Sequence, residues 1–182
     1  MALAGSVRTG SYNLQLRDLA AKKLEERGCQ VEGFDFREKP LPLFSEDIEA
    51  EGYPDHVLAL KQAVNKADGI VLVCPEYNSS ITPMMKNLID WTSRAKHGEK
   101  NEWRRKPVLL MSASPGVYGG VRGLYPVRGA MVEVQALVLS EQACISTAHK
   151  AFDDSGDLAD ERTRGFFESA LDRLVQVVGQ MS

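Results

Sequence analysis

Length, composition and charge place the chain among single-domain globular proteins. It has 182 residues, of which 43% are hydrophobic and 26% are charged, a balance typical of soluble domains with one sizeable core. We expect residues 1–182 to form a single domain. The net charge of −3 argues against a nucleic-acid-binding surface, and no apolar stretch approaches the roughly 18 residues that a membrane span needs. We therefore expect no nucleic acid and no membrane among its partners.

The three cysteines, Cys29, Cys74 and Cys144, are odd in number and far apart in the sequence. No cluster of Cys or His with metal-ligand spacing accompanies them, so we expect neither a disulfide framework nor a metal site. Cys74 and Cys144 lie in apolar runs, which is typical of small buried side chains. No signal peptide is visible. A reducing, cytoplasmic setting is the predicted location.

Apolar periodicity divides the chain into alternating strands and helices. In chain order the predicted elements are strand 1–4, helix 13–27, strand 30–36, helix 54–66, strand 69–74, helix 82–96, strand 107–113, helix 121–134, strand 136–140 and helix 160–178. Gly28 suits the end of the first helix, and Pro83 suits the first turn of the third. Residues 37–54 show no steady period, and long segments of this kind are often functional. We expect this segment to border the active site of a partner subunit.

Strands that are apolar on both faces, separated by amphipathic helices, predict a parallel sheet covered on both sides. Five strands and five helices favour an α/β fold of the flavodoxin-like type, a doubly wound five-stranded parallel sheet with helices on both faces. Such sheets bind ligands beyond the carboxyl ends of their strands, where the strand order reverses. This rule selects three segments, which we call the first loop (residues 5–13), the second loop (75–82) and the third loop (114–121).

The first loop, GSVRTGSYN, places anion-binding groups at the start of a helix. It lacks the Walker lysine and the GxGxxG pattern, so the signatures of a nucleoside triphosphate site and of a dinucleotide site are absent. Its donors are the hydroxyls of Ser6 and Ser11, the Asn13 amide, the Arg8 guanidinium and the first N–H groups of the helix. These groups predict a terminal phosphate as the ligand. The alternative is that Ser11 or Asn13 simply caps the helix.

The second loop, PEYNSSIT, brings an aromatic ring, an amide and hydroxyls directly after a buried strand. This combination suits a flat heteroaromatic ring with polar edges. Pro75 and Tyr77 would form apolar walls, and backbone groups of residues 76–78 would contact the ring edge while the Glu76 carboxylate stays exposed. The alternative is a rigid turn whose Tyr77 packs against a neighbouring helix or subunit.

The third loop, SPGVYGGV, is rich in glycine. Gly116, Gly119 and Gly120 allow positive φ and a close approach of the backbone to a ligand, and their N–H groups would stabilise negative charge on a carbonyl-rich ring. A merely flexible loop is the alternative. A phosphate site, a ring wall and an amide-rich rim at one edge together predict a mononucleotide with a large planar ring, which indicates FMN.

The motifs GSVRTGSYN, CPEYNSSITPMMKNLIDW and SASPGVYGGVRG, in this order, resemble those of the NADPH-dependent FMN reductase family, which includes chromate, quinone and azo-dye reductases. The stretch AFDDSGDLADERTR, ahead of the last helix, also resembles the family's C-terminal region. The resemblance therefore covers nearly the whole chain. Family members usually carry several more residues before the first loop, so we expect either that the first strand is shortened here or that the sequence as given lacks its natural start.

The resemblance implies FMN as the cofactor and NADPH or NADH as the co-substrate. Hydride would pass from NAD(P)H to flavin N5 and electrons onward to a small acceptor, such as a quinone, free flavin, azo dye or metal oxyanion, in ping-pong fashion. No catalytic side chain is required. The implied cofactor-binding residues are Ser6, Arg8, Ser11, Tyr12, Asn13, Pro75, Glu76, Tyr77, Asn78, Ser114, Gly116, Gly119 and Gly120.

Two other classes compete with this interpretation. A flavodoxin-type electron carrier without NAD(P)H oxidase activity would use the same cofactor, but its phosphate loop is rich in Thr, lacks a counterpart of Arg8, and belongs to a strongly acidic protein. A flavin-free regulator of receiver type needs an acidic pair after the first strand, where this chain has Gly5 and Ser6.

The predicted helix 82–96 is unusually apolar, with Met84, Met85, Leu88, Ile89 and Trp91. This is more apolar surface than one face of a sheet needs, so the helix predicts a homodimer or homotetramer, in agreement with the resemblance. A purely internal, core-packing role for these residues is the alternative.

Overall fold

The computed structural model describes residues 1–95 and 101–181. Within them, four parallel strands form one sheet in the order β1 (Ala2–Ala4), β2 (Ile70–Val73), β3 (Pro107–Ala113) and β4 (Leu137–Ile145). The predicted α/β class and the parallel sheet are confirmed. The first strand is short, as expected.

The predicted strand at residues 30–36 is wrong, so the described residues form a sheet of four strands and not five. This segment forms a single parallel bridge between Ala2 and Gly33, where the Ala2 N–H donates to the Glu32 carbonyl at 3.0 Å. A three-residue partner offers little backbone to pair with, and the chain turns at Asp35, whose carboxylate accepts a hydrogen bond from the Arg37 N–H at 2.8 Å. The Arg37 guanidinium beside it lowers the pKa of this carboxyl to about 2.

The alternating pattern of residues 30–36 nevertheless has a structural cause. Phe34 and Phe36 are both buried in the core, with ring centroids 5.0 Å apart. Alternation therefore records which side chains face inward, and it does not require a hydrogen-bonded ladder. Because this segment lies on the free side of β1 and β2 lies on the other, the order of the sheet reverses at β1.

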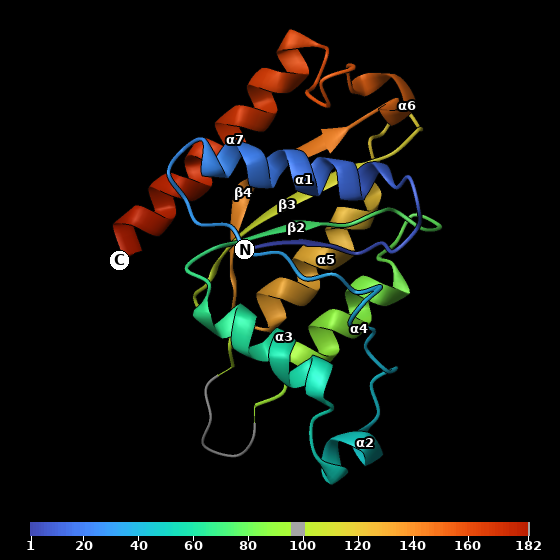
Figure 1. Ribbon diagram of the computed structural model, residues 1–182, viewed down its shortest axis with the longest axis vertical. Coiled ribbons are helices and arrows are strands. Elements are labelled where there is room, and N and C mark those ends of the chain that lie inside the picture. The colour runs from blue at the N-terminus through green and yellow to red at the C-terminus, as the bar shows by residue number, and fades with distance from the viewer. Residues whose placement is uncertain (96–100, 182) are drawn as a thin grey trace.

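Helices cover both faces of the sheet, as predicted (Figure 1). One face carries α1 (Tyr12–Glu25) and α7 (Glu161–Met181), and the other carries α3 (Asp55–Lys66), α4 (Pro83–Thr92) and α5 (Val121–Glu133). Two short helices, α2 (Glu46–Glu51) and α6 (Ala148–Ala151), were not predicted. Among the described residues no helix is long and apolar enough to cross a membrane.

The strands divide their side chains between two cores. Leu72 and Leu110 point toward α3, α4 and α5, whereas Val73 and Met111 point toward α1 and α7. All four side chains are fully buried. This explains why β2 and β3 read as continuous apolar runs, since both faces of a covered parallel sheet are interior.

The apolar side chains of α4 pack within the chain. The helix ends at Thr92 and not at residue 96, which lies outside the described residues. Four of the five apolar residues that suggested an interface are buried in the monomer: Met85, Leu88, Ile89 and Trp91. The internal, core-packing interpretation therefore accounts for this helix.

Residues 37–54 form an arm that packs on α4. The Pro42 carbonyl accepts hydrogen bonds from Asn87 Nδ2 at 2.9 Å and Trp91 Nε1 at 2.7 Å, and the Phe44 N–H donates to Asn87 Oδ1 at 2.8 Å. The Phe44 ring meets Trp91 edge-on at 4.9 Å. The arm thus has fixed polar anchors, although it lacks long regular elements.

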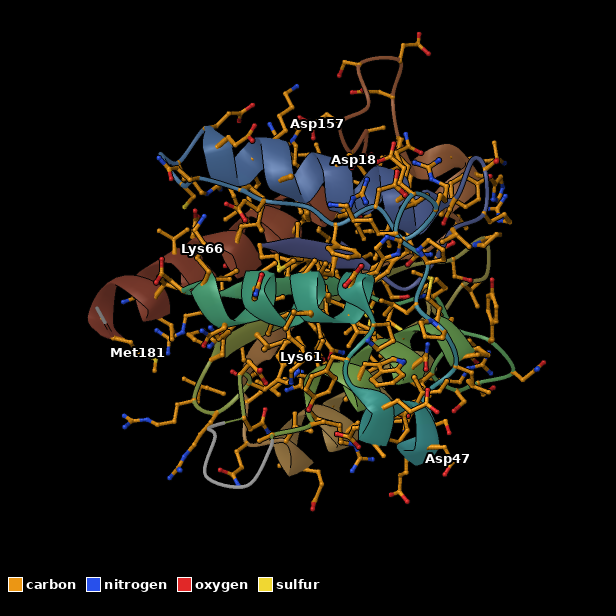
Figure 2. All side chains as sticks on the ribbon, turned by 60° about the horizontal axis from the view of Figure 1, so that its bottom comes forward. Asp18, Asp47, Lys61, Lys66, Asp157 and Met181 are labelled. Atoms are coloured by element: carbon orange, nitrogen blue, oxygen red, sulfur yellow. The ribbon has the colours of Figure 1, made fainter. Side chains whose placement is uncertain are left out.

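An ion pair joins α1 to the turn that precedes α7. Figure 2 shows Asp157 beside α1, where its carboxylate lies 2.9 Å from the Lys23 ammonium. The turn itself forms because Asp153 Oδ1 accepts hydrogen bonds from the N–H groups of Ser155 and Asp157. These contacts fix the two helices that cover one face of the sheet.

A substitution at Leu72 tests the packing of the sheet. Leu72→Ala removes a fully buried side chain, and we expect the free energy of unfolding to fall by about 2–5 kcal/mol in urea denaturation. The matched control is Leu43→Ala, because the Leu43 side chain is 78% exposed; it is expected to change stability by no more than about 0.5 kcal/mol. Equal losses in the two variants would contradict this core.

Candidate functional site

The three loops selected from the sequence meet at the carboxyl edge of the sheet. Ala4, Val73 and Met111 are register partners across β1, β2 and β3, so these strands end close to one level and their following loops share one edge. The first loop follows β1, where the order of the sheet reverses, and the second and third loops follow the neighbouring strands β2 and β3.

The start of α1 in the first loop carries no side-chain cap. Ser11 is the N-cap residue, its backbone is extended, and its side chain accepts no capping hydrogen bond. Ser11 and Ser6 are both buried. The predicted alternative, in which Ser11 caps the helix, is not realised, and the positive end of a 14-residue helix stays available to an anion.

Arg8 is exposed and folds back onto its own loop. Its two terminal nitrogens donate to the carbonyls of Thr9 and Gly10, each at 3.1 Å, and its N–H donates to Ser6 Oγ at 3.3 Å. Gly10 has a φ of 67°, which a turn of this shape requires. Arg8 thus stiffens the loop while its positive charge remains at the surface.

Asn13 and Thr82 connect the loops. The buried Asn13 amide pairs with both backbone groups of Ala113: its Nδ2 donates to the carbonyl at 2.8 Å, and its Oδ1 accepts from the N–H at 3.0 Å. The Thr82 hydroxyl donates to the Gly5 carbonyl at 3.0 Å and accepts from the Met85 N–H at 3.2 Å. Asn13 therefore joins α1 to the end of β3, and Thr82 joins the first loop to α4.

The second loop is a tight two-residue turn. Tyr77 and Ser80 exchange backbone hydrogen bonds at 3.1 and 2.9 Å, and Asn78 and Ser79 both have positive φ, 51° and 61°. Pro75 is buried, whereas Asn78 is exposed and Tyr77 is 50% exposed. The turn is rigid, as the alternative interpretation proposed, but half of the Tyr77 side chain remains open.

Glu76 differs from its expected arrangement. Its side chain is only 8% exposed, because the carboxylate sits on the N-terminus of α5 and accepts a hydrogen bond from the Arg122 N–H at 3.1 Å. The exposed carboxylate expected from the sequence is therefore wrong. No sequence signal links Glu76 to a residue 46 positions away.

The third loop is pressed against the end of β4. Gly119 and Gly120 have φ values of 60° and 85°, and a Cβ on Gly119 would lie 2.8 Å from the backbone carbon of Cys144. Ser114 Oγ accepts a hydrogen bond from the Gly116 N–H at 3.2 Å. The conformation is thus set by close packing, which argues against the merely flexible alternative.

These features fit a mononucleotide. An uncapped helix start beside two buried hydroxyls suits a phosphate, and the half-open Tyr77 with the glycine-lined rim suits a planar ring. Of the residues predicted for the first loop, Asn13 is committed to Ala113, and Tyr12 packs against the core beneath the loop. Their contacts indicate a positioning role.

The sequence analysis did not identify Thr82 as a residue of the site, although a Thr directly before Pro83 is a recognisable helix-start signal.

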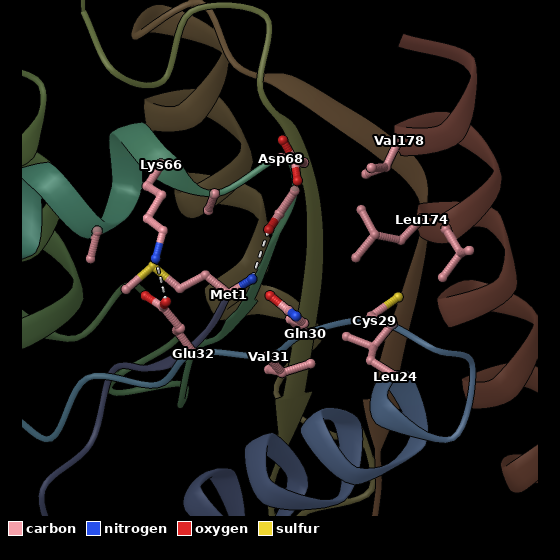
Figure 3. Close-up of a pocket in the computed structure, with 14 residues that line it drawn as sticks. Met1, Leu24, Cys29, Gln30, Val31, Glu32, Lys66, Asp68, Leu174 and Val178 are labelled. Atoms are coloured by element: carbon pink, nitrogen blue, oxygen red, sulfur yellow. Dashed lines mark hydrogen bonds and ion pairs between the residues drawn. The ribbon is translucent and has the colours of Figure 1, made fainter. Parts of the chain in front are cut away.

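A separate cavity of about 360 Å³ lies at the amino edge of the sheet, opposite the three loops (Figure 3). The Met1 ammonium projects into it and donates to the Gly69 carbonyl at 2.9 Å, and burial lowers the pKa of this ammonium. Lys66 and Glu32 form an ion pair at 2.8 Å on its rim. Because none of the three loops lines it, this cavity is not part of the candidate site.

The parallel sheet with helices on both faces is a flavodoxin-like architecture. Sheets of this class bind ligands at the edge where the three loops lie. The model of the NADPH-dependent FMN reductase family matches residues 1–150. The chain belongs to this family, and it is an oxidoreductase. The family predicted from the motifs is confirmed.

Relatives and solved structures agree with this assignment. The chain is 33% identical over 175 residues to an NAD(P)H-dependent FMN reductase of Pseudomonas aeruginosa, covering 96% of this chain and 91% of the relative. It is 35% identical to the NADPH:quinone oxidoreductase of Arabidopsis thaliana, covering 90% and 83%. Its structure superposes with a TM-score of 0.83 on the flavoenzyme FerB, an NAD(P)H:(acceptor) oxidoreductase from Paracoccus denitrificans, at 28% identity over 98% and 96% of the two chains.

Removing the Asn13 amide tests the link between the loops. Asn13→Ala leaves the buried N–H and carbonyl of Ala113 without partners, so we expect the free energy of unfolding to fall by about 2–4 kcal/mol. Gln62→Ala, at an exposed position of α3, is the control and should leave the melting temperature nearly unchanged. An Asn13 variant as stable as the control would show that this bridge does not hold the edge together.

Proposed function

We propose that this chain is an NAD(P)H-dependent flavoenzyme that binds FMN at the carboxyl edge of its sheet and reduces a small acceptor such as a quinone. The observation that carries the proposal is the uncapped start of α1 beside the buried Ser6 and Ser11, at the point where the sheet order reverses. The family membership supports it, since the relatives named above are FMN and quinone reductases.

The three loops divide the binding of FMN between them. In this proposal Ser6, Ser11 and the first N–H groups of α1 hold the phosphate, and the exposed Arg8 adds positive charge beside it. Tyr12 and Asn13 support the loop from below. The ribityl chain and ring lie along the second and third loops, and the residues proposed to contact them are Pro75, Glu76, Tyr77, Asn78, Ser114, Gly116, Gly119 and Gly120.

The protein contributes position and electrostatics. When bound, FMN supplies the redox chemistry, taking hydride from NAD(P)H and returning electrons to the acceptor. The exposed Tyr77 and Tyr118 lie at the rim, where NAD(P)H and the acceptor would bind in turn. No side-chain acid or base is needed in this scheme, so we assign no catalytic residue.

We also propose a cytoplasmic homodimer or homotetramer. Cys29, Cys74 and Cys144 are free thiols, which suits a reducing compartment. Tyr118, Tyr125 and Val132 are large apolar residues on the third loop and α5, and each is more than half exposed. This stripe, and not α4, is the apolar surface that supports a subunit contact.

Anaerobic spectroscopy tests the reaction. Protein reconstituted with FMN should bleach its flavin absorbance on addition of NADPH or NADH and recover it on addition of a quinone. Initial rates at several fixed quinone concentrations should give parallel double-reciprocal lines, because both substrates use one open face. Bound flavin that stays oxidised with NAD(P)H would instead favour an electron carrier, and a chain that binds no FMN would overturn the proposal.

A further inference from the structure

The Glu76 carboxylate is clamped between the second loop and α5. Its Oε2 accepts hydrogen bonds from the N–H groups of Arg122 at 3.1 Å and Gly123 at 3.4 Å. Its Oε1 accepts from Arg122 Nε at 2.8 Å and lies 2.5 Å from Nη2. The carboxylate thus meets both the backbone at the helix start and the guanidinium of the same residue. A carboxylate at this end of a helix is also favoured by the helix dipole.

Close packing holds the backbone at the start of α5 against the second loop. A Cβ on Gly123 would lie 3.0 Å from Glu76 Cα and 3.1 Å from the Ser80 carbonyl, so the helix start rests directly on the second loop. A Cβ on Gly120 would lie 1.9 Å from Ser112 Oγ. Gly120 at the N-cap position and Gly123 in the first turn of α5 therefore permit the approach that brings Glu76 to the helix.

Arg122 also joins the pair to the third loop. Its guanidinium lies over the Tyr118 ring, 5.0 Å from the centroid, and its side chain is 51% exposed. One residue thus contacts the carboxylate of the second loop and the aromatic ring of the third. These are the two loops between which the proposed function places the flavin ring.

We propose that Glu76 and Arg122 are positioning residues that fix the separation of these two loops and keep the charge beside the flavin ring balanced. This inference rests on the proposed function. An unpaired carboxylate beside the ring would oppose the negative charge that reduction adds, and an unpaired guanidinium would favour it. The pair consequently sets the ratio between the affinities of the protein for oxidised and for reduced FMN.

The surroundings support an effect of the Glu76 charge beyond Arg122. Cys144 lies at the end of β4, where Gly119 packs against its backbone. Burial, together with the negative charge of Glu76, raises the pKa of the Cys144 thiol to about 11.

Single and double substitutions separate charge balance from simple structural support. Glu76→Gln keeps the shape and leaves Arg122 unpaired, Arg122→Gln leaves the Glu76 charge unpaired, and the double variant removes both charges. The measurements are the midpoint potential of bound FMN in an anaerobic dye titration, the dissociation constant of oxidised FMN by fluorescence, and the melting temperature. Arg122→Lys is included because it keeps the charge, and the control is Glu141→Gln with Arg173→Gln, an exposed pair 3.7 Å apart.

We expect the two single variants to shift the affinity ratio in opposite directions by about tenfold, which is ~30 mV for a two-electron couple. Arg122→Gln should lower the potential and Glu76→Gln should raise it. In the double variant and in Arg122→Lys, the ratio of the affinities for oxidised and reduced FMN should lie within about threefold of that of the unmodified protein. The control pair should leave this ratio unchanged.

Two outcomes would overturn the inference. If the unmodified protein binds FMN and every variant keeps the same potential, the pair does not act on the flavin. If the two single variants shift the potential in the same direction as each other, and both melting temperatures fall, the pair is only structural. Failure of the unmodified protein to bind FMN is a separate result, because it overturns the proposed function itself.

Discussion

The pairing of the buried Asn13 amide with the backbone of Ala113 is the contact on which the arrangement of the candidate site depends. β1 has only three residues, so the strand alone gives the first loop a short foundation. Asn13 joins α1 to the end of the seven-residue β3 through two hydrogen bonds, and Thr82 fixes Gly5 from the opposite face. Side chains thus supply the rigidity that a longer first strand would give.

This bridging leaves a helix start whose donors are not used internally. In most helices a Ser at the N-cap position satisfies an N–H group of the first turn, but here Ser11 does not, while Thr82 does so for α4 and Glu76 contacts the first turn of α5. Among these three helices at the carboxyl edge, α1 is therefore the one prepared for an external anion. The contrast supports the proposal that the phosphate binds at the first loop and the ring beside the other two.

Much of this arrangement was predictable from the sequence. The three layers follow from the continuous apolar runs of β2 and β3 and from the helical periods of α1, α3, α5 and α7. The shared edge follows from the position of each loop directly after a strand. The prediction of a strand at residues 30–36 was wrong. Alternating apolar residues indicate which side chains are buried, but they do not show that the neighbouring strand has only three residues. The apolar surplus of α4 was internal, because it also packs against the arm of residues 37–54.

The contacts that define the site were less predictable than its location. The sequence places Glu76 in a loop, but it carries no sign that Gly120 and Gly123 let α5 approach closely enough to bind its carboxylate. Asn13 was correctly associated with the first loop, yet its partner lies 100 residues away. Such contacts join residues that are far apart in the sequence, so the pattern of residues around either partner does not predict them.

The central claim is that the start of α1 binds a phosphate, and comparing FMN with riboflavin tests it most directly, because the two differ only in that group. Dissociation constants would be measured by flavin fluorescence for the unmodified protein, for Ser6→Ala with Ser11→Ala, and for Ser169→Ala on the exposed face of α7 as control. We expect FMN to bind at least about a hundredfold more tightly than riboflavin, with the double variant losing most of that difference and keeping its riboflavin affinity. Equal affinities of the unmodified protein for FMN and riboflavin would contradict the account.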